Sequence, residues 1–121
     1  MEIREYVRRD GKAPFVEWTD NLRDRKARIR IRTQLDRILM GNPGDYKSLG
    51  HGLYEIRIYY GPGYRVYYGK EGSRLILLLC GGNKSTQRSD IRLATKYWQD
   101  YRSRSDEKKS TVSGKPDSST C

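Results

Sequence analysis

Three strand-like runs in residues 52–87 constrain the fold more than any other part of the chain. Polar and apolar residues alternate in the first two runs, which is typical of β-strands because successive side chains point to opposite faces of a sheet. Gly-Pro-Gly at residues 61–63 predicts a tight hairpin between these two runs, and Lys-Glu-Gly at residues 70–72 precedes the third. The block therefore predicts neighbouring strands of one sheet.

The two faces of these strands differ in chemistry. One face is aliphatic and aromatic and fits against helices: Tyr54, Ile56, Ile58, Tyr60, Tyr64, Val66 and Tyr68. The other face carries charged and aromatic polar groups: Glu55, Arg57, Tyr59, Arg65 and Tyr67. Arginines on a sheet face favour a phosphate-bearing ligand, because a planar guanidinium can hold two oxygens at once. The third run, residues 75–80, is apolar throughout, which predicts a central strand covered on both faces.

The segments before and after this block predict one more strand and three helices. Residues 2–9 form a first strand, and a short helix with a proline in its first turn begins at residue 14. A second helix is capped by Asn21 or Asp24 and ends near Met40, where Gly-Asn-Pro-Gly follows. A last helix covers about residues 86–102. The predicted order is strand, helix, helix, three strands, helix.

The net charge of the chain is +10, from 25 Lys and Arg against 15 Asp and Glu. Such an excess favours contact with nucleic acid or another polyanion. Much of it lies on one arc of the second helix: Arg23, Arg25, Lys26, Arg28, Arg30, Arg32 and Arg37. We consider Arg28 and Arg32 candidates for contact with a nucleic-acid backbone. The alternatives are a solvated face and a docking surface for an acidic partner, because no aromatic residues are interleaved with the arginines.

The remaining composition limits the class of protein. Residues 103–121 contain eight Ser or Thr and one aliphatic residue, so we expect a folded domain over residues 1–102 and a disordered tail after it. Cys80 ends an apolar run and is expected to be buried. No Cys-x-x-Cys pair or Cys/His cluster supports a metal site, and we expect no metal or cofactor. The chain has no apolar stretch of membrane length, so we expect a cytoplasmic protein without membrane contact.

Three segments of the block carry a resemblance to a known family. Gly-Leu-Tyr-Glu-Ile-Arg, Gly-Tyr-Arg-Val-Tyr-Tyr and Leu-Leu-Cys-Gly-Gly-Asn-Lys-Ser-Thr-Gln resemble, in order and spacing, the HigB-like branch of the RelE/ParE toxin superfamily. This branch includes addiction-module killer proteins and phage-derived Gp49-like proteins. The resemblance covers about residues 1–102. It implies an α+β fold with an antiparallel sheet packed against the two N-terminal helices.

The resemblance also implies an activity and partners. It implies a type II toxin that enters the ribosomal 30S A site and cleaves translated mRNA without a metal. Its expected partner is an antitoxin from the same operon, commonly a helix-turn-helix DNA-binding protein. Some members of the superfamily poison DNA gyrase instead, so the fold does not choose the target. A gyrase poison and a non-toxic basic module that binds nucleic acid or an antitoxin are therefore the alternatives.

The matching positions suggest which residues act. Arg57 and Arg65 match basic residues of the family's catalytic sheet, and we assign them to the scissile phosphate. Lys84 matches a region where the family often places another basic catalytic residue; it would bind phosphate or transfer a proton, or be an ordinary loop lysine. His51 is the only histidine, and a side chain that titrates near neutrality is a candidate general base. The alternative for His51 is a loop position at the entrance of a strand.

The polar face offers three further candidates for substrate contact. Glu55 stands where some relatives have a basic residue; it would orient an arginine, act as a base, or simply pair with Arg57 or Arg65. Tyr59 and Tyr67 would stack on bases or donate to phosphate, since stacking on an aromatic ring contributes about 1–3 kcal/mol per base. Their alternative role is to supply ordinary strand propensity.

Overall fold

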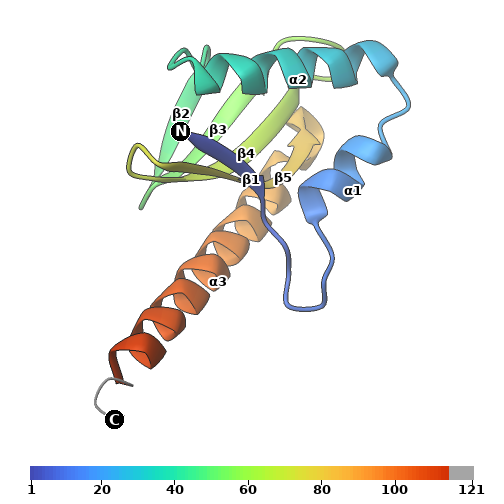
Figure 1. Cartoon of the computed structure of the whole chain (residues 1–121). Helices are drawn as coiled ribbons and strands as arrows, with labels where there is room; N and C mark the ends of the chain where they lie inside the picture. The colour runs from blue at the N-terminus through green and yellow to red at the C-terminus, as the bar shows by residue number, and fades with distance from the viewer. Residues whose placement is uncertain (115–121) are drawn as a thin grey trace.

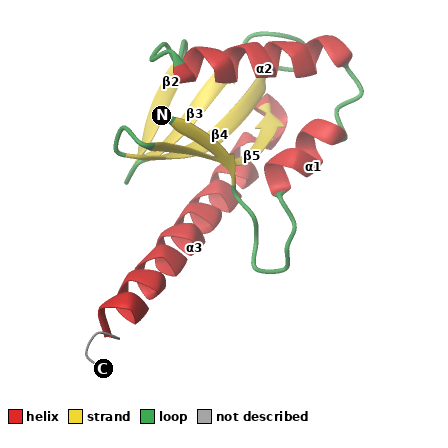
Figure 2. Cartoon of the chain, in the orientation of Figure 1, coloured by secondary structure: helices red, strands yellow, loops and turns green. Residues whose placement is uncertain are grey.

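The computed structural model describes the backbone of residues 1–114 and the side chains of residues 1–105. The described chain is an α+β fold with a five-stranded mixed sheet and three helices (Figures 1 and 2). In order, the elements are β1 (Glu2–Glu5), α1 (Pro14–Asp20), α2 (Arg25–Leu39), β2 (Tyr46–Gly50), β3 (Leu53–Ile58), β4 (Tyr64–Glu71), β5 (Leu75–Asn83), the 3₁₀ turn η1 (Lys84–Thr86) and α3 (Gln87–Gly114).

The strands lie side by side in the order β1-β5-β4-β3-β2. Strands β2, β3, β4 and β5 pair antiparallel, as the hairpin turns predict, whereas β1 pairs parallel with β5. The expectation of a purely antiparallel sheet with four strands was therefore wrong on two counts. The sequence prediction missed β2 because this strand lies at the sheet edge and its side chains are mostly exposed, so it lacks an apolar alternation. The first strand also ends at Glu5, earlier than expected.

Helices α1 and α2 cover one face of the sheet. The buried stripe of α2 consists of Ala27, Ile31, Leu35 and Ile38. It packs on the side chains of β3 and β4 that the alternation assigned to the core, among them Ile56 and Val66, both fully buried. Asp24, one of the two predicted caps, begins the helix: its carboxylate accepts hydrogen bonds from the backbone N–H groups of Lys26 and Ala27, at 3.0 and 3.3 Å.

Helix α3, the helix predicted after the last strand, covers the opposite face of the sheet. Its Ala94 and Trp98 are buried against Leu77 and Leu79 of β5. This contact requires a glycine in the sheet, because a Cβ placed on Gly69 of β4 would lie 2.3 Å from the Trp98 ring. The apolar run of β5 is thus buried from both sides, as predicted, because helices cover both faces.

Helix α3 is longer than expected and projects beyond the sheet (Figure 1). It extends to Gly114 and so includes residues 103–114, the first part of the segment expected to be disordered. A helix that is already nucleated extends at little cost through Lys- and Glu-containing sequence, which composition alone did not reveal. The rest of that segment, residues 115–121, lies outside the described residues.

No helix among the described residues is both long and apolar enough to span a lipid bilayer. Among the same residues, no three His, Cys, Asp or Glu side chains gather in a way that could hold a metal ion.

Candidate functional site

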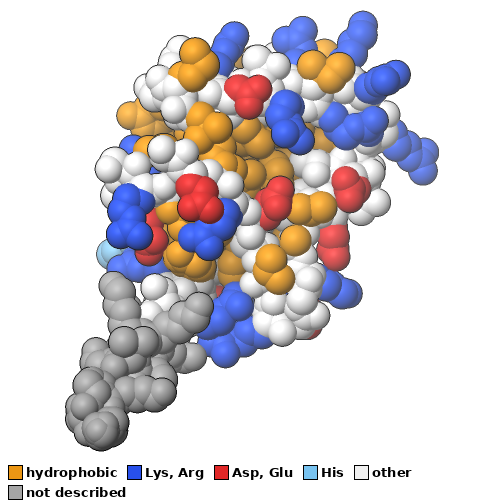
Figure 3. Space-filling view, in the orientation of Figure 1, with side chains coloured by type: hydrophobic (Ala, Val, Ile, Leu, Met, Phe, Trp, Pro, Cys, Tyr) orange, Lys and Arg blue, Asp and Glu red, His pale blue; other side chains and the backbone are white. Residues whose placement is uncertain are grey.

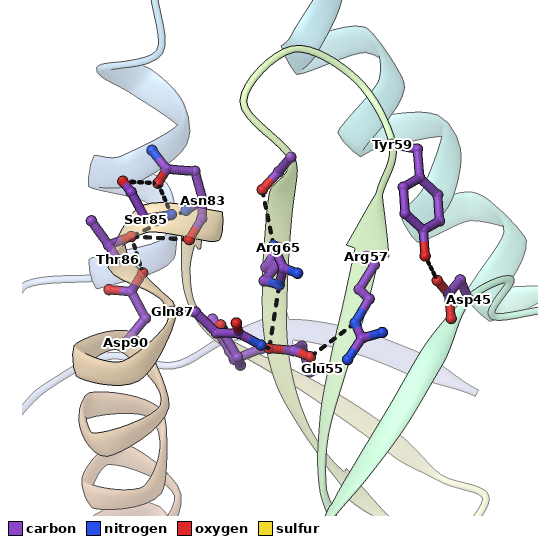
Figure 4. Close-up of polar contacts among 12 residues, drawn as sticks. Asp45, Glu55, Arg57, Tyr59, Arg65, Asn83, Ser85, Thr86, Gln87 and Asp90 are labelled. Carbon is purple, nitrogen blue, oxygen red and sulfur yellow. Dashed lines mark hydrogen bonds and ion pairs between the residues drawn. The ribbon is translucent and has the colours of Figure 1, made fainter.

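Two arginines face each other across the pair of strands β3 and β4. Arg57 and Arg65 are direct partners in the register of this antiparallel pair. Like charges at directly opposed positions destabilise a sheet. The pair therefore needs a nearby negative charge, and Glu55 supplies it from two residues earlier on the same face (Figure 4).

The carboxylate of Glu55 is completely buried and fully engaged. Its Oε1 lies 3.3 Å from Nε of Arg57, and its Oε2 lies 3.6 Å from Nε of Arg65. The Tyr67 hydroxyl donates to Oε2 at 3.0 Å, and Nε2 of Gln87 donates to the same oxygen at 2.9 Å. We call these five residues the Glu55 cluster. Because both oxygens have partners, Glu55 orients the arginines and does not have the geometry of a general base.

Tyr67 belongs to the floor of the site and not to its surface. Its side chain is fully buried beneath the start of α3, with its hydroxyl on Glu55. Burial and the nearby Glu55 carboxylate raise the pKa of Tyr67 far above its usual value. The expectation that Tyr67 stacks on a base was therefore wrong, because α3 covers the face to which the alternation correctly assigned it.

The two guanidinium groups differ in exposure. The side chain of Arg57 is 31% exposed and that of Arg65 only 12%. Nη1 of Arg65 donates to the carbonyl of Gly63, at 3.3 Å, in the turn between β3 and β4. The hydrogen bond to Glu55 is the main cause that raises the pKa of Arg57, so its positive charge is secure. Partly buried, oriented guanidinium groups suit recognition of a phosphate.

Lys84 is the first residue of η1 and lies close to Arg65. A Cβ built on Gly63 would be 3.6 Å from Cβ of Lys84 and 3.8 Å from Nη1 of Arg65, so both side chains flank this glycine. The lysine is exposed. Arg57, Arg65 and Lys84 thus lie at the same end of the sheet.

The backbone around Lys84 is fixed by a compact set of polar contacts (Figure 4). The Asn83 carboxamide oxygen accepts from the backbone N–H of Ser85 at 2.9 Å, and Thr86 Oγ1 accepts from the backbone N–H of Asn83 at 3.1 Å. The Thr86 hydroxyl in turn donates to Asp90 at 2.5 Å. This reciprocal capping box holds η1 against the start of α3 and presents Lys84 outward.

Tyr59 lies at the rim of the site and is 78% exposed. Its hydroxyl donates a hydrogen bond to the carboxylate of Asp45, which raises the pKa of Tyr59. Arg57 lowers the pKa of this hydroxyl and so opposes the effect of Asp45. Tyr59 keeps the exposure that stacking on a base requires.

Three other predicted residues lie away from the Glu55 cluster. His51 occupies the turn between β2 and β3 with a φ of 55°, at the opposite end of β3 from Arg57, about 20 Å along the strand. Its carbonyl accepts a hydrogen bond from the Trp98 indole at 2.7 Å, which is a structural role. Arg28 and Arg32 belong to α2, which covers the other face of the sheet. Lys and Arg side chains gather over α2 along the upper edge of Figure 3.

Gln87 and Asp45 are the residues of the site that sequence reasoning missed. Gln87 entered the sequence analysis only as the last residue of the family-like segment. The capping pattern of Asn-Lys-Ser-Thr-Gln could have placed Gln87 at the first turn of α3. Asp45 precedes a strand that was not predicted. No local signal connects it with Tyr59, which lies 14 residues later in the chain.

The chain is similar to a known protein. The chain is 44% identical over 80 residues to an uncharacterized protein of Haemophilus influenzae, and the alignment covers 66% of this chain and 81% of that protein. No protein-family model matches the chain.

Proposed function

We propose that this chain, which belongs to the same family as the uncharacterized Haemophilus influenzae protein, is an endoribonuclease toxin of the RelE/ParE superfamily, HigB-like branch. The observation that carries the proposal is the opposed pair Arg57 and Arg65, held by the buried carboxylate of Glu55 beside the exposed Lys84. Oriented cations in a partly water-excluded place stabilise the charge that develops on a reacting phosphate.

The proposed reaction is an internal transfer at an RNA phosphodiester. The 2′-oxygen loses its proton to a water molecule and bonds to phosphorus, the bond from phosphorus to the 5′-oxygen breaks, and the 5′-oxygen gains a proton. The products are a 2′,3′-cyclic phosphate and a 5′-hydroxyl. Arg57 and Arg65 would neutralise the pentacovalent phosphate, and Lys84 would add a third charge or protonate the leaving oxygen.

The aromatic and basic surfaces would position the substrate. Tyr59, exposed at the rim beside Arg57, would stack on a base of the bound codon. The basic face of α2 would dock on the polyanionic 30S subunit, which holds the mRNA in its A site. Neutralisation by an antitoxin, commonly a helix-turn-helix protein, completes the proposed toxin–antitoxin pair.

Mapping RNA 5′ ends in cells that express the protein tests this proposal. We expect new 5′-hydroxyl ends within translated messages and growth arrest. Arg65→Ala should lower cleavage by about 10²–10³-fold, the usual effect of removing one transition-state donor. Arg74→Ala, an exposed arginine at the other end of the sheet, is the matched control and should cleave normally.

Two outcomes would contradict the proposal. Growth arrest with intact transcripts and an accumulation of covalent gyrase–DNA complexes would identify a gyrase poison. Growth without arrest, together with binding to nucleic acid or an antitoxin, would identify a non-toxic binding module.

A further inference from the structure

A second polar site lies between the segment after β1 and the outer face of α3. It is an open depression of about 410 Å³, and none of its residues belongs to the Glu55 cluster. The residues that line it are Tyr6, Arg8, Arg9, Leu93, Lys96, Tyr97 and Asp100. We call it the α3 pocket.

Asp100 contributes a carboxylate to the lining of the α3 pocket, and this carboxylate accepts three hydrogen bonds. The Asp100 carboxylate accepts from the Tyr6 hydroxyl at 2.5 Å, from Nε of Arg9 at 3.0 Å and from Nη2 of Arg104 at 2.6 Å. Burial alone would raise the pKa of Asp100, but these three hydrogen bonds outweigh it and lower the pKa below its usual value. Asp100 therefore holds Tyr6 and Arg9 in place at the floor of the α3 pocket. The charges of Arg9 and Arg104 compensate the charge of its carboxylate.

The walls of the α3 pocket combine cations with an apolar surface. Arg8, which pairs with Asp10 at 2.8 Å, and the exposed Lys96 contribute positive charge from opposite sides. Leu93 is 42% exposed, and the Tyr97 ring stacks on Tyr6 with a centroid distance of 5.1 Å. A cationic wall beside an aliphatic and aromatic one fits a phosphate with an attached planar base.

We infer that the α3 pocket binds one nucleotide unit of single-stranded RNA, with its phosphate near Arg8 and Lys96 and its base against Leu93 and Tyr97. This inference rests on the proposed ribonuclease function. The same helix connects the two sites: Gln87 contacts Glu55, and Leu93 begins the pocket wall six residues later, about 9 Å along α3. The Glu55 cluster and the α3 pocket therefore share helix α3 as a common element.

Binding of a short 2′-O-methyl RNA, which cannot be cleaved, separates this site from the chemistry. We expect Lys96→Glu to raise the Kd of the full chain at least about fivefold and to lower the salt dependence of binding by about 0.7, the slope for one phosphate contact on a single strand. Lys70→Glu is the matched control, because it makes the same charge change on an exposed residue of β4 outside the pocket. We expect its Kd to stay within about twofold of wild type.

A photocrosslinking measurement keeps the inference testable if Lys96→Glu is poorly folded. With 4-thiouridine in the oligonucleotide, we expect crosslinks on wild-type residues 6–9 or 93–100. Equal Kd values for Lys96→Glu and Lys70→Glu, or crosslinks confined to α2, would overturn the inference. So would a polyglutamate peptide that loses binding in Lys96→Glu while the RNA Kd is unchanged, because the pocket would then take an acidic peptide.

The two proposals fail in different experiments. Cut transcripts combined with equal Kd values would leave the ribonuclease function standing and remove the α3 pocket as an RNA site. RNA binding that depends on Lys96, with no cut transcript in cells, would remove the ribonuclease function and keep the pocket as an RNA site.

Discussion

Glu55 determines the orientation of Arg57 and Arg65. A carboxylate in a fully buried position is costly unless hydrogen bonds and opposite charges compensate it. Here two guanidinium groups, one hydroxyl and one carboxamide provide that compensation. The same contacts fix the rotamers of Arg57 and Arg65, so Glu55 is a positioning residue for the proposed phosphate site.

Glu55→Gln should destabilise the protein, because the amide keeps the shape of the side chain and removes the charge between two arginines. We expect the free energy of unfolding to fall by about 2–3 kcal/mol, since the 12% exposed Arg65 loses its acidic partner. Urea unfolding measures this change. Glu5→Gln, on the exposed part of β1, is the control and should shift stability by less than about 0.5 kcal/mol. Equal effects of the two substitutions would show that the buried ion pairs stabilise nothing.

The face of a residue could be predicted from the sequence, but not what covers that face. Alternation alone placed Glu55, Arg57, Arg65 and Tyr67 together opposite the core side chains, and the structure agrees. The same alternation says nothing about α3, whose first turn is brought over β3 and β4 by tertiary packing. Tyr67 was therefore expected at the surface and is buried instead.

Local signals predicted the helices and hairpins better than the sheet edges. The spacing of Ala27, Ile31 and Leu35 identifies the buried stripe of α2, and Gly-Pro-Gly joins β3 to β4, because both depend on nearby residues. The parallel pairing of β1 with β5 joins segments about seventy residues apart and has no local signature. The edge strand β2 lacks a buried face that would impose a period on its sequence.

Contact between α3 and the sheet depends on a glycine beneath a tryptophan. Gly69 of β4 lies directly under the ring of Trp98. The indole N–H donates to the carbonyl of His51 at 2.7 Å, and the ring stacks on Tyr101 at 5.7 Å, so it is held on two sides. The ring therefore cannot retreat from a larger residue without losing these contacts.

Gly69→Ala should loosen this packing. The new Cβ would lie 2.3 Å from the Trp98 ring, and overpacking of this kind costs about 1–3 kcal/mol. We expect a lower urea midpoint and a changed near-ultraviolet circular dichroism signal from the tryptophan. The double variant Gly69→Ala/Trp98→Leu should lose less stability than the sum of its single variants, because leucine removes the clash. Strict additivity would contradict direct packing between the two residues.

At the scale of the whole molecule, charge and burial are divided between the two faces of the sheet. The face under α2 is apolar apart from tyrosine hydroxyl groups such as that of Tyr68, and the basic residues lie on the outer surface of that helix. The face under α3 contains the buried polar groups: Glu55, Tyr67 and the hydroxyl of Tyr6. Ionisation of buried hydroxyl and thiol groups therefore affects the entire fold at high pH.

The free energy of unfolding should fall steeply at alkaline pH, over a pH range set by the pKa values of the buried tyrosine hydroxyl and cysteine thiol groups. Burial is the main cause that raises the pKa of Tyr6 and of Tyr68 from 10.0 to about 12, and that of Cys80 from 9.0 to about 12. In this window the folded state keeps protons that the unfolded state has lost. The stabilisation is therefore complete below pH 9 and is lost progressively as pH rises toward 12.

The free energy of unfolding from urea titrations at a series of pH values, together with tyrosinate absorbance, measures this effect. We expect Tyr68→Phe to reduce the loss of stability above pH 10, because one late-titrating group is removed. Tyr46→Phe, a half-exposed ring on β2, is the matched control and should leave the slope unchanged. If all the tyrosines titrated together near pH 10 while the protein stayed folded, the buried hydroxyl groups would not be coupled to folding. The packing around these hydroxyl groups would then open locally without global unfolding.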